Sequence, residues 1–230
     1  MSTLGAEQVR ASLTVISGAA SSVLLLAGTD ADALIETATL AGDTYADAAA
    51  VHAAEWYDDA RDDAGAAGSF TAEPAEIPGP ARYEALVRWG LVEGTSHDAQ
   101  LALIVGGLQR IIANAHRVTV LENVARDPAG AKWARKARAG ACEFCAMLAT
   151  RGAAYTSKDA ALVVGASNGG RVRGPRMAGQ KYHDHCHCSV EPVFAIGDGA
   201  MPDWLHEMDQ LYEQATLNSN KGERLNDFRK

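Results

Sequence analysis

Residues 98–123, DAQLALIVGGLQRIIANAHRVTVLEN, decide the fold class. Their apolar side chains recur every three or four residues, which places them on one face of a helix. The pattern ends at Asp127-Pro128, because proline has no amide hydrogen and disfavours helical conformation in the residue before it. The face is broad enough for a core helix, and it carries Leu101, Ile104, Val105, Leu108, Ile111, Ile112, Ala115, Val118 and Leu121.

Helical spacing also occurs upstream, over residues 6–27, over residues 30–65 and from about Arg82 to Leu91. Asp30 or Asp32 is expected to cap the second helix, and Gly28 to end the first. Residues 65–80 are rich in Gly and Pro without apolar periodicity, which predicts an exposed linker. The chain is therefore predicted to be mainly α, with an N-terminal helical domain over residues 1–130.

The character of the sequence changes after Pro128. Residues 131–139 predict a short basic helix, and residues 165–180, rich in Gly and Arg, predict a mobile loop. Residues 189–194 predict a short extended segment, and residues 202–217 an amphipathic helix. We therefore expect a small, loop-rich α+β module over residues 131–195, followed by a C-terminal amphipathic helix and tail over residues 196–230.

The charge is divided unevenly along the chain. The formal net charge is −8, but residues 1–130 carry 7 basic and 18 acidic side chains, residues 131–190 carry 10 and 3, and residues 191–230 carry 4 and 8. The three parts therefore have net charges of −11, +7 and −4. Two interpretations stay open: the basic part approaches an anionic partner, or it packs against the acidic helices.

The compartment bears on the chemistry of the cysteines. The apolar stretch from Leu13 to Ala27 is interrupted by serines and a glycine and is too short to span a bilayer, so no membrane partner is expected. No secretory leader is recognisable, which favours a cytoplasmic, reducing location. Disulfides do not persist there, so clustered cysteines indicate metal ligands or catalytic thiols.

The four cysteines form two close pairs, Cys142 with Cys145 and Cys186 with Cys188. A Cys-x-x-Cys step lets two thiolates bind one ion from a tight turn, and a second ligand pair completes a tetrahedron. Histidines surround the second pair, and the His-x-x-Cys spacing occurs twice, which leaves the ligand set open. We predict one structural Zn²⁺ per chain, which stabilises the module over residues 131–195. The candidate ligands are Cys142, Cys145, His183, Cys186 and Cys188, with His185 and His187 as spare imidazoles.

Other interpretations of the cysteines are weaker. Buried cysteines without metal would be expected singly rather than in two pairs. A thioredoxin-like motif needs a preceding strand, whereas the preceding residues are predicted to be helical. A zinc deaminase needs a His-x-Glu motif before the cysteine pair, and His52 is instead followed by Glu55 at helical spacing. The isolated histidines His97, His116 and His206 are predicted to lie at the surface or at the edge of the core.

Two stretches of the chain resemble the Mu F-like minor head proteins of tailed phages. They are CEFCAMLATRG over residues 142–152 and YHDHCHCSVEPVF over residues 182–194. In that family, a Cys-x-x-Cys and then a His-x-x-Cys-x-Cys element with a short strand end an otherwise helical protein. The family's histidine falls on His183 and its cysteines on Cys186 and Cys188. His187 stands where relatives often have arginine, which adds a further possible ligand.

The resemblance implies a minor capsid or head morphogenesis protein, assembled in the host cytoplasm and located inside the phage head near the portal. Its expected partners are the portal protein, the major capsid protein or both, and genomic DNA bound without sequence preference. An enzymatic role is not expected. Basic side chains that could contact DNA or a protein partner are Arg171, Arg173, Arg176 and Lys181.

The alternative function is that of a His-Me finger (HNH-like) endonuclease containing zinc. Such enzymes combine cysteine pairs with an Asp-His dipeptide, as in Asp184-His185, and the histidine activates water beside a divalent ion. A second Cys-x-x-Cys and a following Asn or His are missing after Cys188, and Pro192 stands where a helix should begin. A host zinc-ribbon transcription factor is less favoured still, because the acidic helical domain would repel DNA.

Overall fold

Four helices make up most of the described part of the protein. The structure, a computed structural model, describes residues 3–28, 30–136, 149, 188–194 and 210. The helices are α1 (Thr3–Leu25), α2 (Ala31–Asp63), α3 (Pro80–Glu93) and α4 (His97–Arg126). The prediction of a mainly α fold is confirmed for these residues. The predicted zinc-stabilised module and C-terminal helix lie largely outside them.

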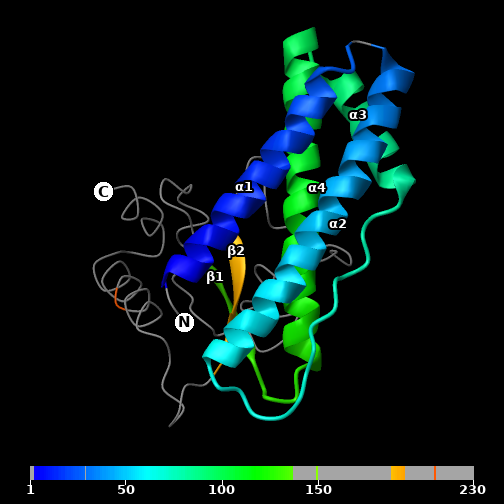
Figure 1. The fold of residues 1–230 in the computed structure, drawn as a ribbon. Helices are drawn as coiled ribbons and strands as arrows, with labels where there is room; N and C mark the ends of the chain where they lie inside the picture. Colours follow the sequence, from blue (N-terminus) through cyan, green and yellow to red (C-terminus); the bar gives the residue numbers. More distant parts are fainter. Residues whose placement is uncertain (1–2, 29, 137–148, 150–187, 195–209, 211–230) are drawn as a thin grey trace, which may run out of the picture.

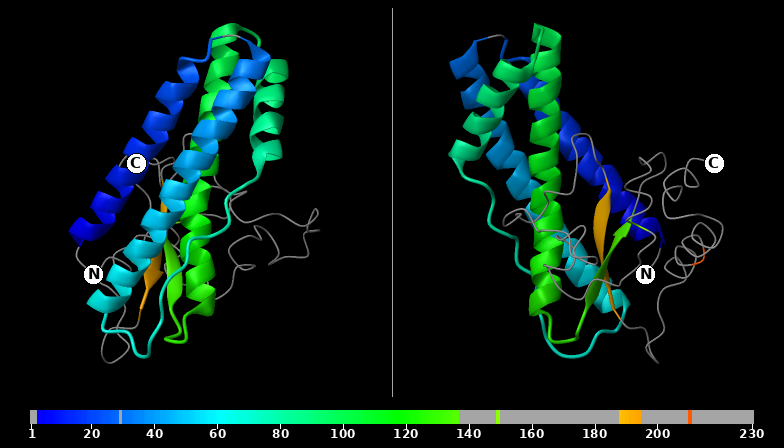
Figure 2. Two further views of the ribbon diagram at one scale, coloured as in Figure 1. Left: turned by 45° about the vertical axis from the view of Figure 1, so that its right-hand side comes forward. Right: turned by 180° about the vertical axis from the view of Figure 1, so that it is seen from behind.

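The long helices α2 and α4 form the centre of the bundle. Helix α1 packs against both of them, and α3 packs against both of them from another side (Figures 1 and 2). The predicted Asp30 cap is present, since its carboxylate accepts a hydrogen bond from the Ala33 amide at 2.9 Å. Helix α4 ends at Arg126, and Asp127 caps it directly before Pro128. Gly28 adopts a φ of +77°, a left-handed conformation that favours glycine after a helix.

Two apolar cores are stacked along α2 and α4. The first, here called the bundle core, lies between the four helices, and the second, here called the sheet core, lies where α2 and α4 meet the β strands. The boundary between them falls between Ala50 and Ala53 on α2 and between Ala115 and Val120 on α4. The bundle core includes Leu34, Tyr83, Ile104, Leu108 and Ile112, and the sheet core includes Trp56, Tyr57, Val120, Trp133, Val190 and Phe194.

The segment between α2 and α3, residues 64–79, is a loop as predicted, but side chains of two helices hold its backbone. The amide of Ala72 donates to Asp58 Oδ1 at 2.9 Å, that of Glu73 to Asn123 Oδ1 at 3.0 Å, and that of Ala75 to Thr119 Oγ1 at 3.0 Å. Ala72 and Ala75 are buried. The segment is therefore a strap fixed across α2 and α4 rather than an exposed linker over its whole length.

A two-stranded antiparallel sheet follows α4. Strand β1 (Lys132–Lys136) pairs with β2 (Ser189–Val193), and Gly130, at a φ of +72°, lies in the turn that leads into β1. The extended segment predicted after Cys188 is confirmed. The basic helix predicted over residues 131–139 is wrong, because residues 132–136 form β1. So short a helix would be marginal alone, whereas pairing with β2 satisfies the backbone and buries Trp133.

The packing of Tyr83 of α3 against α2 depends on Gly42. A β-carbon at this position would overlap the ring of Tyr83, which is fully buried. Gly42→Ala should therefore lower the free energy of unfolding by about 1–3 kcal/mol, as overpacking typically does. The matched control is Gly18→Ala in α1, where the added carbon meets open space and should stabilise the helix by up to about 1 kcal/mol. Urea denaturation followed by circular dichroism measures both, and equal effects at the two sites would contradict the expectation.

Candidate functional site

The sheet joins the two ends of the segment that carries the cysteine motifs. Lys136 at the end of β1 lies opposite Ser189 at the start of β2. Cys188 directly precedes β2, and Cys142 comes six residues after Lys136, a stretch that can span about 20 Å at most. The register thus attaches both halves of the predicted metal motif to the same end of one small sheet. The chain can therefore bring thiolates and imidazoles from both halves together, a donor set that suits Zn²⁺.

Cys188 is the one predicted ligand that lies within the described residues. It is buried in the sheet core, in a cluster with Trp133 and Val190. Its carbonyl oxygen accepts a hydrogen bond from Arg117 Nε of α4 at 3.0 Å. Arg117 is itself fully buried and also donates from Nη1 to Asn114 Oδ1 at 2.9 Å. The backbone at Cys188, in the second cysteine pair, is therefore held to helix α4 by a hydrogen bond.

The other predicted site residues lie outside the described part of the chain. Among the residues that the structure does describe, no group of three or more His, Cys, Asp or Glu side chains could hold a metal ion. The zinc site therefore stays a prediction. The predicted residues outside the described ranges are the ligands Cys142, Cys145, His183 and Cys186 and the basic residues Arg171, Arg173, Arg176 and Lys181.

Buried charges fix β2 in the sheet. The side chain of Glu191 is buried, and its Oε2 lies 3.5 Å from Lys136 Nζ on the neighbouring strand. Its Oε1 accepts a hydrogen bond from Ser189 Oγ at 3.4 Å. Sequence reasoning missed this carboxylate. The antiparallel register could have revealed it only once β1 was recognised as a strand.

A second buried polar group, centred on Asp127, joins α2, α4 and the turn before β1. Asp127 Oδ2 accepts hydrogen bonds from Arg61 Nε at 3.0 Å and from the Tyr57 hydroxyl at 3.1 Å, and Oδ1 accepts one from the Ala129 amide at 2.8 Å. Arg61 also donates to the carbonyl oxygen of Ala67 at the start of the strap. Burial and the nearby Asp127 carboxylate raise the pKa of Tyr57 above its ordinary value, so this hydroxyl remains a donor.

His116 lies in a different place from the one predicted. It is fully buried, and its ring stacks on Trp56 of α2 with 5.7 Å between the ring centroids. The prediction of a surface or core-edge position is therefore wrong. Helical spacing could have found it, because His116 follows Ile112 and precedes Val120 by four residues each, on the core face of the helix.

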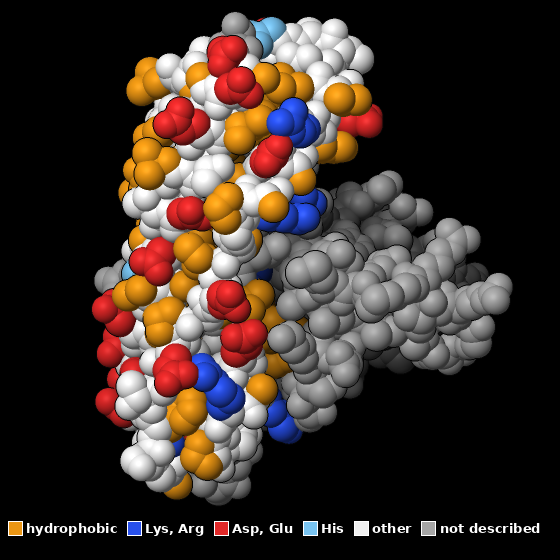
Figure 3. All heavy atoms as spheres, turned by 90° about the vertical axis from the view of Figure 1, so that its right-hand side faces the viewer, with side chains coloured by type: hydrophobic (Ala, Val, Ile, Leu, Met, Phe, Trp, Pro, Cys, Tyr) orange, Lys and Arg blue, Asp and Glu red, His pale blue; other side chains and the backbone are white. Residues whose placement is uncertain are grey.

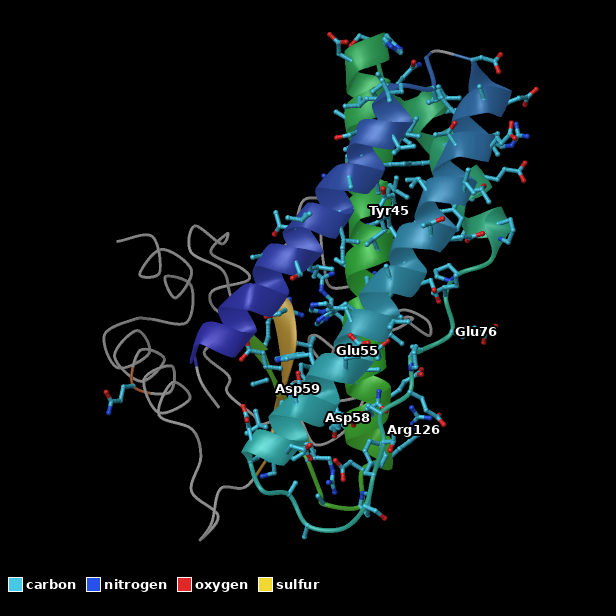
Figure 4. The ribbon with its side chains drawn as sticks, in the orientation of Figure 1. Tyr45, Glu55, Asp58, Asp59, Glu76 and Arg126 are labelled. Atoms are coloured by element: carbon cyan, nitrogen blue, oxygen red, sulfur yellow. The ribbon has the colours of Figure 1, made fainter. Side chains whose placement is uncertain are left out.

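The surface of the bundle is acidic along α2. The only basic residue of this helix, Arg61, is buried in its ion pair with Asp127. Acidic side chains line one edge of the face in Figure 3, and Figure 4 labels Glu55 and Asp59 on the lower half of α2. This surface would repel the phosphates of nucleic acid. The exposed acidic residues of α2 are Asp32, Glu36, Asp47, Glu55, Asp59, Asp62 and Asp63.

A helical bundle that continues through a small sheet into a cysteine-bearing segment is matched by a known family model. The model of the VG15 protein family matches residues 6–215. The chain belongs to the VG15 family. No curated protein and no solved structure matches it.

VG15 is a family of viral proteins, which supports the prediction of a phage protein. The matched range begins inside α1 and includes the other three helices, both strands and all four cysteines. Among the described residues, no helix has the length and apolar character that crossing a membrane requires.

Proposed function

We propose that this VG15 protein is a structural minor capsid protein, of the Mu F-like head morphogenesis type, that acts inside the head of a tailed phage near the portal. The observation that carries the proposal is the viral family match over residues 6–215, which includes the motifs that resemble Mu F-like proteins. The order of elements supports it, since a helical bundle leads through β1 into the Cys-x-x-Cys motif and β2 follows the second cysteine pair. The proposed role is not enzymatic.

The charges divide the proposed contacts between two parts of the chain. The acidic surface of α2 favours a protein partner, the portal or the major capsid protein, over DNA. Contact with genomic DNA is assigned to the basic segment, through Arg171, Arg173, Arg176 and Lys181, because cationic side chains neutralise phosphates without reading sequence. A structural Zn²⁺ held by the cysteine motifs would order this segment at the end of the sheet.

The proposal is tested by asking where the protein is found and whether it cuts DNA. Mass spectrometry of purified virions should detect it in particles, and phage carrying a stop codon in its gene should form fewer complete heads. Purified protein should not nick plasmid DNA with Mg²⁺ present. The protein's absence from virions, with normal head assembly in the stop-codon phage, would contradict the proposal. Mg²⁺-dependent nicking that disappears in His185→Ala would instead support the endonuclease.

A further inference from the structure

His116 occupies the boundary between the two cores of the molecule. The bundle core ends at Ala115 on α4, and the sheet core begins at Val120. On α2 the corresponding boundary contains His52, whose ring centroid lies 6.3 Å from that of His116. The two histidines thus face each other across the α2–α4 contact at the level where one apolar core gives way to the next.

The environment of His116 suits only the neutral imidazole. The side chain has an exposed fraction of 0%, and neither ring nitrogen has a hydrogen-bond partner among the residues that the structure describes. One face of the ring is stacked on Trp56 with an interplanar angle of 28°. A charged ring held there would lose its water without gaining a partner, which is costly.

The charged groups near His116 oppose its protonation. Burial is the main cause of a lowered pKa, to about 3, and His52 of α2 and Arg117 of α4 lower it further. Among the carboxylates of the neighbouring elements, Glu191 of β2 pairs with Lys136, and Asp58 of α2 accepts a hydrogen bond from the strap. Glu55 and Asp59 of α2 are exposed to solvent.

The remaining neighbouring elements bring no compensating charge. Residues 11–25 of α1 contain no charged side chain. Helix α3 contributes to the bundle core and not to the sheet core, and its Glu84 pairs with Arg88. In the strap, Glu73 pairs with Arg126, and Glu76 is exposed (Figure 4). The charged groups of β1 are cationic, Lys132, Arg135 and Lys136.

We propose that the contact between α2 and α4 at His116 is an acid-sensitive joint. Protonation of His116 moves the two helices apart at the sheet core, while the bundle core stays packed. An imidazolium can regain water only if α2 and α4 part at Trp56. The next residue, Arg117, holds the carbonyl of Cys188, so the same movement loosens the attachment of β2 and of the cysteine segment that it ends. Figure 1 shows both strands beside the lower halves of α2 and α4, where this opening would occur.

The sign of the pH dependence follows from the two states of the joint. In the opened state His116 has an ordinary histidine pKa of about 6.5, whereas in the closed state its pKa is lowered to about 3. Between these values the opened state binds more protons, so the closed joint is fully stable above about pH 6.5 and loses stability as the pH falls toward 3. For this one group, the equilibrium constant of opening should rise about 25-fold between pH 7 and pH 5.

Hydrogen exchange on the full chain tests the proposal. After correction for intrinsic exchange rates, peptides over residues 52–60 and 116–124 should exchange about 25-fold faster at pH 5 than at pH 7. Peptides over residues 34–46 and 101–111, in the bundle core, should change much less. His116→Leu should remove most of the pH effect in the sheet core. The control His97→Gln, at the exposed first residue of α4, should keep it.

Two outcomes would overturn the proposal. One is the same pH dependence of exchange in wild type and His116→Leu. The other comes from wild-type protein alone, and so applies even where the variant does not fold: an NMR titration in which the His116 ring protonates near pH 6.5 while the sheet core stays protected. The expected titration shows a neutral His116 in the closed protein down to pH 5, with exchange in the sheet core rising over the same range.

Discussion

Asp127→Ala should lower the free energy of unfolding by about 3–5 kcal/mol, the cost of leaving a buried charge without its partner. The substitution removes the acceptor of Arg61 Nε, of the Tyr57 hydroxyl and of the Ala129 amide at once. The side chain of Asp127 is fully buried and that of Arg61 has an exposed fraction of 6%, so water cannot replace the lost bonds without opening the fold. Urea denaturation gives the size of the loss.

The exposed pair Glu84–Arg88 on α3 provides the matched control for Asp127. Its two side chains are 47% and 63% exposed, and Glu84→Ala should cost no more than about 0.5 kcal/mol. The double variant Arg61→Met, Asp127→Ala should be less destabilised than the sum of its single substitutions, because the uncompensated charge is then absent. Additive losses, or equal losses for Asp127→Ala and Glu84→Ala, would show that the buried pair does not hold the end of the bundle together.

The helices could be predicted from the sequence because each depends on a local pattern. The apolar period of α4 and the proline at its end are properties of neighbouring residues, as are the Asp30 cap and the Gly28 turn. His116 belongs to the same periodic face, so its burial could have been predicted from the sequence. The acidic character of the N-terminal helices could also be predicted from the distribution of charge along the sequence, and the acidic surface of α2 agrees with that prediction.

Strand β1 and the buried polar groups depend on contacts between distant parts of the chain. The local sequence of Lys132–Lys136 predicts a basic helix, but these residues form a strand because residues 53–61 positions later pair with them. The extended segment predicted after Cys188 indicated that a second strand must exist, since an isolated strand needs a partner to satisfy its backbone. From the sequence, Asp127 is predicted only to end a helix. Its contacts with Arg61 and Tyr57 form only when α2 packs against the end of α4.

The predicted zinc site would depend on the same long-range pairing. The sheet holds Lys136 opposite Ser189, which places the start and the end of the cysteine segment within reach of one ion. A structural zinc ion in small domains contributes about 10–16 kcal/mol to folding, because the ligands come together only in the folded state. The helical bundle has its own apolar core, so it should not need the metal. Loss of zinc should therefore have a large effect that is confined to one part of the chain.

The expressed protein should contain about one Zn²⁺ per chain, and Cys142→Ser or Cys145→Ser should remove it, since a tetrahedral site that loses a thiolate binds zinc far more weakly. Metal analysis measures the stoichiometry, and limited proteolysis should show new cleavage within residues 137–188 while circular dichroism keeps most of the helical signal. His206→Gln, a histidine outside the motif, should change neither.

Cys188→Ser separates two roles of this residue. Loss of zinc from the variant indicates that Cys188 is a ligand, whereas retained zinc with a less stable sheet core indicates that the buried thiol only packs beside Trp133 and Val190. A folded wild-type protein without zinc would refute the site, and equal loss of helicity throughout the Cys142→Ser variant would show that the bundle does depend on the metal.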